Sequence, residues 1–368
     1  MSAILAREDH PFVKAARLVE PGRFEMTSLP RPTPGDGQIL VRVEAVSICG
    51  SDLGAYLGRH PRIVAPAILG HEFAGVVEEV GPGVSGPSVG ERGAVEPTVS
   101  CRRCRFCLRG NENICPHYRV IGEDDTLPGA MSGFVAVAAD HFHPIPPEVS
   151  FDEGALVQPL AIGLHAVRDR GRVSAGETVL IVGAGPIGMA ILLAAKDAGA
   201  RVLISDTLPY RLEQALQLGA DRAIDAARAD VAAIARADTD GYGVDAAFEA
   251  VGGTTDEAFA TAYDATSRGG RVVVLGSFKS STVPLRIGDM KYGEIEIRGS
   301  QAHPFSFRDV IAGIAAGRIP AERLITHRFP LAQVGDAFRL LEGRGERVQK
   351  IVLLPGAAAG PAREGADA

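Results

Sequence analysis

The sequence predicts an α/β protein in which a β-rich region accompanies a doubly wound parallel sheet. Residues 178–206 read as a strand, a glycine turn, a helix and a second strand. Strand and helix patterns then keep alternating from Gly176 to about Gly299. Before about residue 150, by contrast, short apolar runs alternate with glycine and proline turns. We therefore expect two regions of different construction.

The turn within residues 178–206 is a dinucleotide-binding fingerprint in its expected context. Its first glycine permits a tight turn, its second lets a pyrophosphate approach the backbone, and its third allows the helix to pack closely on the strand. The helix N-terminus offers unpaired N–H groups to phosphate. A tight turn in an unrelated α/β domain is the alternative interpretation. The expected cofactor-binding residues of this turn are Gly183, Gly185, Pro186, Ile187 and Gly188.

Asp206 ends the second strand of this unit. A carboxylate there can accept hydrogen bonds from both ribose hydroxyls and would repel a 2′-phosphate, so the sequence favours NAD over NADP. Arg211 is a nearby cation that could accommodate a phosphate, which keeps NADP open. Further cofactor contacts are expected where later strands end, because ligands bind at the carboxyl ends of such strands. These candidates are Val251, Leu275, Gly276 and Ser277.

Length and composition limit the classes of function. A chain of 368 residues suggests about two domains, and a net charge of −7 without a basic stripe argues against nucleic-acid binding. No apolar run approaches the length of a membrane span, and the N-terminus does not read as a signal peptide. We therefore expect a cytoplasmic protein.

The first region reads as a β-rich domain. Residues 1–12 look like a loose start, and Gln38 to Val46 alternates apolar and polar residues as a half-buried strand does. Phe73 to Val80 and Met131 to Ala139 are further expected strands. His141 and His143 follow and are interpreted as ordinary strand or loop residues.

Three residues in this region could hold a catalytic metal ion. Cys49 is followed about twenty residues later by His71 and Glu72. One thiolate, one imidazole and one carboxylate would hold zinc and leave a position open for substrate, which is typical of a catalytic site. A buried apolar thiol beside a solvated turn is the alternative.

A second cluster predicts a structural metal. Four thiolates within 15 residues suit a closed tetrahedral zinc site that would stabilise a lobe with little core of its own. An iron–sulfur cluster or a disulfide pair are the alternatives, although the spacing lacks the close fourth ligand of bacterial ferredoxins. The four residues are Cys101, Cys104, Cys107 and Cys115.

The remaining chain links and completes the two regions. Asp152 to Val167 reads as an apolar helical stretch that crosses between domains, and it carries Gln158, a buried amide in need of a partner. Further helices are expected at Phe307 to Ala316 and Gln333 to Glu342, and a strand at Lys350 to Leu354. The tail from residue 356 is rich in alanine, glycine and proline and is expected to be disordered.

Taken together, these motifs resemble the zinc-dependent medium-chain dehydrogenase/reductase superfamily over nearly the whole chain, roughly residues 13–354. The motifs are Cys49-Gly50-Ser51-Asp52, Gly70-His71-Glu72, the four-cysteine lobe, the Gln158-Pro159-Leu160 segment, the glycine turn and Asp206. Within the superfamily they look most like the polyol (sorbitol) dehydrogenase branch, which also contains threonine, glucose and amino-cyclitol dehydrogenases.

The resemblance implies a GroES-like catalytic domain from residues 1–167 and 300–368, with a structural-zinc lobe at about 96–117. It places a Rossmann domain at residues 168–299. It also implies a cleft between the domains for NAD and zinc, two zinc ions per subunit, and a homodimer or homotetramer. Cys49, His71 and Glu72 match the family's zinc ligands, and Gln158 lies where many polyol dehydrogenases carry a glutamate.

Two further departures from the family pattern bear on chemistry. Gly54 stands where the proton relay often has a histidine, so the proton would leave through water or His60. Ala302 and His303 stand where sorbitol dehydrogenases carry an Arg-Tyr pair, which argues against a linear polyol that relies on that arginine. Tyr56 and His303 are the candidate substrate-pocket residues.

The activity implied is reversible oxidation of a secondary alcohol to a ketone, with Ser51 accepting the hydroxyl proton and the nicotinamide accepting the hydride. The expected substrate is a small-molecule polyol, sugar, cyclitol or amino-alcohol. One alternative is a zinc-independent enone or quinone reductase of the same fold. Another is a nucleotide-binding relative that has lost its chemistry, which Gly54 and Gln158 keep open.

Overall fold

The computed structural model describes residues 11–124, 126–253, 256–278, 282–303, 305–343, 347–357 and 363–364. Most of the predicted loose start and of the predicted disordered tail therefore lies outside the described residues. By packing, the chain divides into two compact units. Unit 1 comprises Met1–Val99, Arg119–Ala155 and His327–Ala368, and unit 2 comprises Ser100–Tyr118 and Leu156–Thr326. These packing units differ from the predicted domains, whose boundaries stay a prediction.

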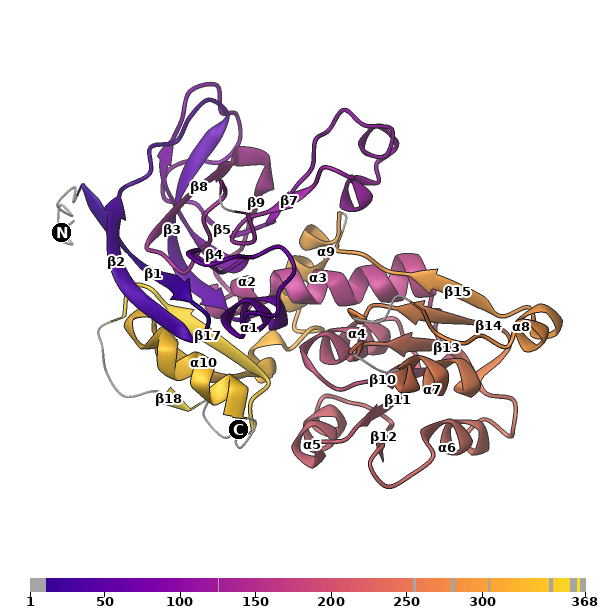
Figure 1. Ribbon diagram of the computed structural model, residues 1–368. Helices are drawn as coiled ribbons and strands as arrows, with labels where there is room; N and C mark the ends of the chain where they lie inside the picture. The colour runs from indigo at the N-terminus through magenta and orange to yellow at the C-terminus, as the bar shows by residue number, and fades with distance from the viewer. Residues whose placement is uncertain are drawn as a thin grey trace. The chain divides into compact units, whose positions relative to one another are not determined.

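Unit 1 is built on an eight-stranded sheet in the order β18-β16-β17-β3-β4-β5-β9, with β8 also paired to β3, and on a separate hairpin of β1 and β2 (Figure 1). A small pair of β6 and β7 flanks the segment that carries the four cysteines. The strands are β1 Phe12–Glu20, β2 Arg23–Pro30, β3 Gln38–Ser47, β4 Glu72–Val80, β5 Arg92–Val95, β6 Thr98–Val99, β7 Arg119–Val120, β8 Phe134–Ala138, β9 Phe142–Pro144, β16 Ile325–Pro330, β17 Lys350–Leu354 and β18 Arg363–Glu364.

The β-rich character predicted for this region is confirmed. The expected strands at residues 38–46, 73–80 and 350–354 correspond to β3, β4 and β17, and the one at 131–139 corresponds to the shorter β8. Both faces of β3 are largely covered, since Ile39, Leu40 and Val41 are all fully buried, and the strand is therefore more buried than its alternating sequence predicts. The helices of the unit are α1 Gly50–Tyr56, α2 Phe151–Ala155 and α10 Val334–Gly343.

Unit 2 contains a six-stranded parallel sheet in the order β12-β11-β10-β13-β14-β15. In chain order this is 3-2-1-4-5-6, the arrangement of doubly wound dinucleotide-binding sheets, so the predicted Rossmann architecture is confirmed. The strands are β10 Thr178–Val182, β11 Arg201–Asp206, β12 Arg222–Asp225, β13 Val244–Glu249, β14 Thr266–Val274 and β15 Glu296–Gly299.

Helices connect and cover these strands, as Figure 1 shows. They are α3 Val157–His165, α4 Pro186–Asp197, α5 Pro209–Gln217, α6 Val231–Ala237, α7 Glu257–Ala265, α8 Ile287–Gly293 and α9 Phe307–Ala315. The helical stretch expected at residues 152–167 is two helices, α2 and α3, separated at Leu156, followed by a π-helical segment Ala166–Gly171. The division between the two packing units falls within this run. No helix among the described residues is long and apolar enough to span a membrane.

Candidate active site

The loop between β3 and α1 places Cys49 and Ser51. Cys49 has an extended backbone and caps α1, and its N–H donates to Oδ2 of Asp52 at 2.9 Å. Asp52 is completely buried, so this hydrogen bond fixes the turn from strand to helix inside the unit. The position of the Cys49 thiol therefore depends on a residue three places later.

Strand pairing brings Cys49 to His71 and Glu72. In the antiparallel pair of β3 and β4, Ser47 lies opposite Glu72. Residues just beyond the end of β3 therefore meet residues at the start of β4. One candidate ligand atom from each of Cys49, His71 and Glu72 lies within 4.8 Å of the others. The three residues predicted to form a catalytic metal site are thus neighbours within unit 1.

A buried network surrounds this cluster. Oδ1 of Asp52 lies 3.7 Å from Nδ1 of His71, which is an ion-pair distance but too long for a hydrogen bond. Oε2 of Glu72 accepts hydrogen bonds from the Ser47 hydroxyl and from the ammonium group of Lys350. Lys350 also donates to the main-chain oxygen of Ile48 at 3.1 Å. Since both donors use one oxygen of Glu72, the other is available to a metal ion.

The charges of the cluster act on one another. Burial lowers the pKa of His71, but the negative charges of Cys49, Asp52 and Glu72 outweigh it and raise that pKa well above its usual value. Burial raises the pKa of Asp52. A compact set of sulfur, nitrogen and oxygen donors of net negative charge suits zinc, and an ion there would compensate that charge.

Oγ of Ser51 in unit 1 and Oε1 of Gln158 in unit 2 are among the buried polar atoms that have no hydrogen-bond partner within the described residues. Ser51 lies in the first turn of α1, two residues after Cys49, and Gln158 lies in the first turn of α3. A buried acceptor without a partner is costly, so both atoms are available to a substrate, a cofactor or a metal ion.

His60 lies beside Gly54, the glycine at the position of the family's relay histidine. A Cβ on Gly54 would stand 3.8 Å from Cβ of His60, so the imidazole occupies the neighbourhood of the missing side chain. Nδ1 of His60 accepts the N–H of Ile63 at 3.0 Å. Burial lowers the pKa of His60. The ring therefore carries its proton on Nε2 when neutral.

The glycine turn of unit 2 has the geometry that its sequence predicts. Gly183 has φ of +101°, and a Cβ at Gly188 would stand 1.8 Å from the main-chain oxygen of Gly183. A Cβ at Gly185, by contrast, would meet nothing nearer than the Arg211 side chain at 3.7 Å. The backbone around Gly185 at the start of α4 is thus open to a phosphate, as a pyrophosphate site requires.

Asp206 stands at the end of β11 beside this turn. Its two carboxylate oxygens accept the N–H groups of Ala184 at 2.8 Å and Leu208 at 2.9 Å. Arg211 lies 3.4 Å from the carboxylate, so the nearby cation is paired with Asp206 itself. The structure therefore brings Asp206, Arg211 and the glycine turn together at one edge of the sheet.

A buried carboxylate that the sequence analysis did not single out holds the loops that carry the predicted cofactor contacts Val251 and Gly276. Glu249, at the end of β13, is completely buried. Its side chain accepts the N–H groups of Val251 at 2.8 Å, Gly252 at 2.7 Å and Gly276 at 3.1 Å. Glu249 thereby ties the loop after β13 to the end of β14, and Val251 and Gly276 come together at the carboxyl edge of the sheet.

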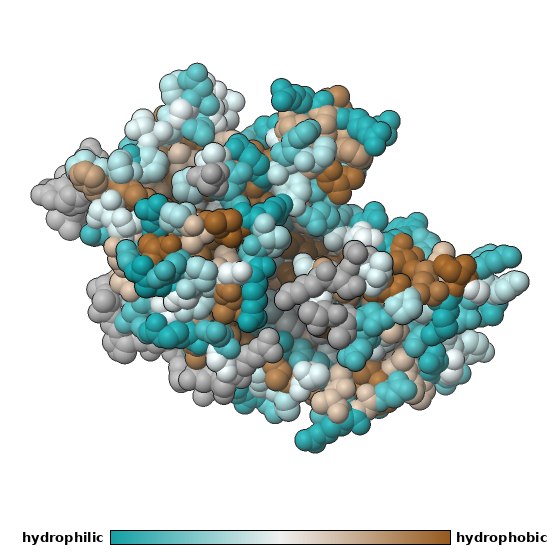
Figure 2. Space-filling view, in the orientation of Figure 1, coloured by the Kyte–Doolittle hydropathy of each residue, from teal (hydrophilic) through white to brown (hydrophobic). Residues whose placement is uncertain are grey.

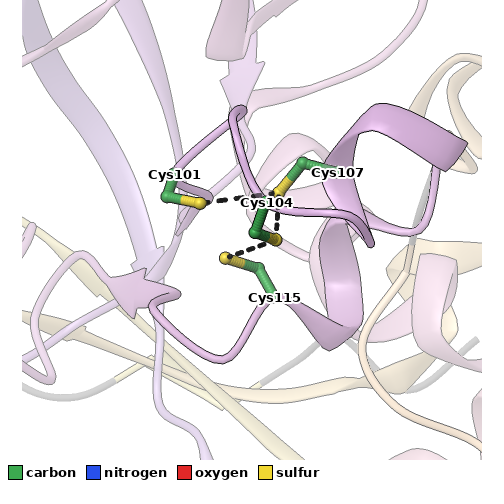
Figure 3. A group of neighbouring side chains, drawn as sticks. All are labelled: Cys101, Cys104, Cys107 and Cys115. Atoms are coloured by element: carbon green, nitrogen blue, oxygen red, sulfur yellow. Dashed lines mark hydrogen bonds between the residues drawn. The ribbon is translucent and has the colours of Figure 1, made fainter.

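The four cysteines converge on a second cluster, within unit 2 (Figure 3). The sulfur atoms are 3.5 Å apart for Cys104–Cys107, 3.9 Å for Cys104–Cys115 and 4.0 Å for Cys101–Cys107. A tetrahedral site with zinc–sulfur bonds of about 2.3 Å separates its sulfurs by about 3.8 Å. None of these cysteines forms a disulfide, so the donor set fits zinc and disagrees with the disulfide alternative.

The two candidate substrate-pocket residues lie in packed surroundings. The Tyr56 ring is buried against Phe24 and Phe338 in unit 1, with ring centroids 5.8 and 5.1 Å away. His303 is buried in unit 2 and meets the ring of Phe307 edge-on at 5.0 Å. Both rings serve packing, and their predicted contact with substrate stays a prediction.

Comparison with known proteins identifies the family. Residues 35–147 match the model for the alcohol dehydrogenase GroES-like domain, and residues 186–314 match that for zinc-binding dehydrogenases. The chain is 33% identical to sorbitol dehydrogenase of Bacillus subtilis (strain 168), over 92% of this chain and 97% of the relative. It is 32% identical to D-arabitol-phosphate dehydrogenase of Enterococcus avium, over 89% and 94% of the two chains.

A solved structure agrees with these relatives. The zinc-binding dehydrogenase of Sinorhizobium meliloti 1021, solved bound to NADP, superposes with a TM-score of 0.87 at 32% identity, over 94% of this chain and 100% of that one. The GroES-like and Rossmann-type architecture and the resemblance inferred from the motifs are therefore confirmed. The chain belongs to the zinc-type alcohol dehydrogenases of the medium-chain dehydrogenase/reductase superfamily, with sorbitol and other polyol dehydrogenases among its relatives.

Proposed function

We propose that this chain is a zinc- and NAD-dependent dehydrogenase that reversibly oxidises a secondary alcohol to a ketone. Its family acts on CH–OH groups as oxidoreductases. The observation that carries the proposal is the buried cluster of Cys49, His71 and Glu72, whose donor atoms lie within 4.8 Å of one another. The unpartnered hydroxyl of Ser51, two residues from Cys49, supports it.

In this proposal each residue has a defined task. Cys49, His71 and Glu72 hold the zinc ion, while Asp52 orients the imidazole and Lys350 and Ser47 orient the carboxylate. A bound zinc ion supplies Lewis acidity that favours loss of the substrate's hydroxyl proton, and a bound nicotinamide accepts the hydride. The Ser51 hydroxyl would accept that proton as it gives up its own, which would pass to the cofactor ribose and then, through water or His60, to solvent.

Gln158 is proposed either as a further zinc ligand or as the residue that would hold a water molecule at the zinc site. Its Oε1 is buried and has no hydrogen-bond partner among the described residues. A carbonyl oxygen in place of a carboxylate brings no negative charge, so the ion would be a stronger Lewis acid. The proposed second zinc ion, held by the four cysteines, has all four positions filled and serves structure alone.

NAD is the proposed cofactor, with NADP as the alternative. The Asp206 carboxylate stands where it can accept hydrogen bonds from ribose hydroxyls and would repel a 2′-phosphate. Arg211 is already paired with Asp206, which reduces its availability to a phosphate. The Sinorhizobium meliloti relative, however, was solved with NADP. Reduction of each cofactor by the same substrate distinguishes the two.

We propose a polyol, sugar, cyclitol or amino-alcohol as substrate, because the relatives act on sorbitol and on D-arabitol phosphate. The rival functions are a zinc-independent enone or quinone reductase and a nucleotide-binding relative without activity. The cluster of Cys49, His71 and Glu72 disfavours the first, since a reductase without zinc has no need of it. Gly54 and Gln158 are the departures that favour the second.

We also propose assembly into a homodimer or homotetramer in the cytoplasm. β15 is one of the two edge strands of the six-stranded sheet, and exposed edges are ready to pair with another chain. Ile297 on β15 and Ile287 on α8 are exposed, and Figure 2 shows an apolar area over this end of the sheet. The free thiols of the four-cysteine cluster suit a reducing compartment.

A screen of NAD reduction tests the proposed function. Zinc-loaded enzyme is mixed with polyols, aldoses, cyclitols, amino-alcohols, threonine and simple alcohols, with and without a chelator, and NADH absorbance is followed. The proposal expects a chelator-sensitive rise with at least one class. Reduction of enones by NADH that a chelator leaves unchanged would show the zinc-independent reductase. Binding of NAD and zinc without turnover of any class would show the inactive relative.

A further inference from the structure

His60 lies beside α1, the helix that carries Ser51, and both residues belong to unit 1. After α1 the chain turns back, so that the N–H groups of Arg59 and His60 both donate to the main-chain oxygen of Gly54, at 2.7 and 3.1 Å. This turn brings Cβ and Cδ2 of His60 to 3.8 and 3.9 Å from the point where a Cβ on Gly54 would stand. The ring of His60 therefore covers a position on α1 that has no side chain of its own.

Ser51 and Gly54 lie on the same face of α1. Residues three apart on a helix are neighbours, with Cβ positions about 5–6 Å apart. Oγ of Ser51 is buried and has no hydrogen-bond partner among the described residues. Gly54 has no side chain that could stand between this hydroxyl and the ring of His60. Both side chains can therefore reach one small molecule over this face of the helix.

The loop after His60 fixes which ring nitrogen carries the proton. Nδ1 accepts the N–H groups of Ile63 at 3.0 Å and of Arg62 at 3.3 Å, so the proton of the neutral ring lies on Nε2. Nε2 is bonded to Cδ2, the ring atom on the side of Gly54. The hydrogen bonds of the ring within the described residues all go to Nδ1. His60 therefore offers one unused N–H donor on its edge towards α1.

The surroundings keep this ring neutral. Burial lowers the pKa of His60, and the positive charges of Arg62 and of a protonated His71 act in the same direction, whereas Glu123 opposes them. Glu123 is itself paired with Arg62 at 2.7 Å. A second proton would have to occupy Nδ1 and displace the two N–H groups that it accepts. His60 is thus a fixed donor and a poor proton acceptor, so release of the proton through water fits this geometry better than release through His60.

We propose that His60 is a specificity residue, whose Nε2–H donates to a hydroxyl on the carbon next to the one that is oxidised. Two adjacent hydroxyls with a hydrogen bond of about 2.8 Å at each end span roughly 8 Å. The separation of Ser51 and the His60 ring across Gly54 is of that order. A hydroxyl oxygen accepts from Nε2, whereas a protonated amine has only donors. The inference rests on the proposed function and narrows its substrate class to vicinal diols, such as polyols and sugars, at the expense of amino-alcohols.

Three substrates that differ in one group test this preference. Kinetic constants are measured for butane-2,3-diol, 3-aminobutan-2-ol and butan-2-ol of matching configuration, with zinc-loaded enzyme and NAD at neutral pH, where the amine is protonated. We expect kcat/KM for the diol to exceed that for each of the other two about 3- to 10-fold, the range of one hydrogen bond between uncharged groups. A diol that is no better than butan-2-ol, or an amino-alcohol that equals the diol, contradicts the proposal.

Variants assign that preference to His60. His60→Asn keeps an oxygen that can accept the loop N–H groups but has no donor at the place of Nε2, so the preference for the diol should disappear. His60→Gln places an amide N–H near that position and should recover part of it. His143→Asn is the matched control, since His143 pairs with Glu96 and should keep the wild-type preference. Equal loss of activity on all three substrates in His60→Asn would show a proton relay or a structural role and overturn the proposal.

Magnetic resonance of the imidazole separates this inference from the proposed function. In zinc-loaded enzyme labelled with nitrogen-15 at histidine and saturated with NADH, the His60 signals are identified by their absence from His60→Asn. We expect a neutral ring protonated on Nε2 between about pH 6 and 8, and a shift of that N–H signal when butane-2,3-diol is added. A ring protonated on Nδ1, or a signal that the diol leaves unmoved, overturns the proposal even if alcohols are oxidised. If the signal shifts as expected but no alcohol is oxidised, the proposed function fails and the donor role of His60 stands.

Discussion

The two metal-type clusters of this chain are built in opposite ways. The four-cysteine cluster draws all its donors from residues 101–115 and offers four sulfurs, of which two belong to half-buried residues. The cluster of Cys49, His71 and Glu72 offers three different donors, and two of the three residues are buried. It is surrounded by a network in which Lys350 lies 278 residues from Glu72 in the sequence. One cluster is local and closed, and the other is assembled by the fold and left open.

This difference bears on function. A site with four sulfur ligands has no position for a substrate, whereas three mixed ligands leave one. The cluster of Cys49, His71 and Glu72 also needs charges placed around it, because the buried carboxylate of Glu72 is paired with the buried ammonium group of Lys350 and the buried Asp52 lies beside His71. Changes to the mixed cluster should therefore alter chemistry, and changes to the four-cysteine cluster should alter stability.

Cys49→Ser should have the largest effect. It removes a thiolate ligand, so we expect turnover to fall at least about 1000-fold, since Lewis-acid catalysis contributes several kcal/mol. One of the two zinc ions should be lost, as measured by elemental analysis, and the other retained. Wild-type turnover in Cys49→Ser would refute the catalytic assignment of this cluster.

Lys350→Met tests the buried network. Removing one partner of a buried ion pair should lower the free energy of unfolding by about 3 kcal/mol, because Glu72 keeps a buried charge. Denaturant unfolding of the zinc-free protein measures it. Lys196→Met is the matched control, since Lys196 pairs with Asp221 at the surface and should cost less than about 1 kcal/mol. Equal effects of the two substitutions would show that the network does not stabilise the cluster.

Ser51→Ala separates proton transfer from zinc binding at the cluster of Cys49, His71 and Glu72. The substitution removes the proposed proton acceptor but no ligand, so turnover should fall about 100-fold while both zinc ions stay bound. Comparing kcat with zinc content separates this effect from that of Cys49→Ser. Unchanged kcat would remove Ser51 from the proton path and leave water as the acceptor.

Cys104→Ser should have the smallest effect on chemistry. The four-cysteine site loses one of its four ligands, and we expect a loss of about 2 kcal/mol in stability, seen as a melting temperature lower by about 3 °C. The molecules that remain folded should keep their kcat. A loss of kcat with an unchanged melting temperature would contradict a purely structural role.

The features that could be predicted from the sequence are those that short, local motifs determine. The four cysteines, the glycine turn and Asp206 are contiguous motifs, and their geometry follows from strand, turn and helix. Lys350 and Ser47 were not singled out, because their common partner, Glu72, lies far from both along the chain. Glu249 was missed because its partners are main-chain N–H groups, which no sequence motif marks. Lys350 is the first residue of the apolar strand β17, and a basic residue at that place is the one sequence feature that could have drawn attention to it.

The packing of the two candidate pocket residues also depends on tertiary contacts. Tyr56 could be placed near the cluster by its distance from Cys49 in the sequence, but its burial against Phe24 and Phe338 follows from elements at both ends of the chain.

The most direct test of this account is a zinc count during chelation, with activity followed in the same sample. The account predicts two zinc ions per chain. The first to leave should take all alcohol-oxidising activity with it, return with added zinc, and be absent from Cys49→Ser. The second should stay until the protein loses stability. Full activity after loss of the first ion, or a single ion held only by the four cysteines, would contradict the account.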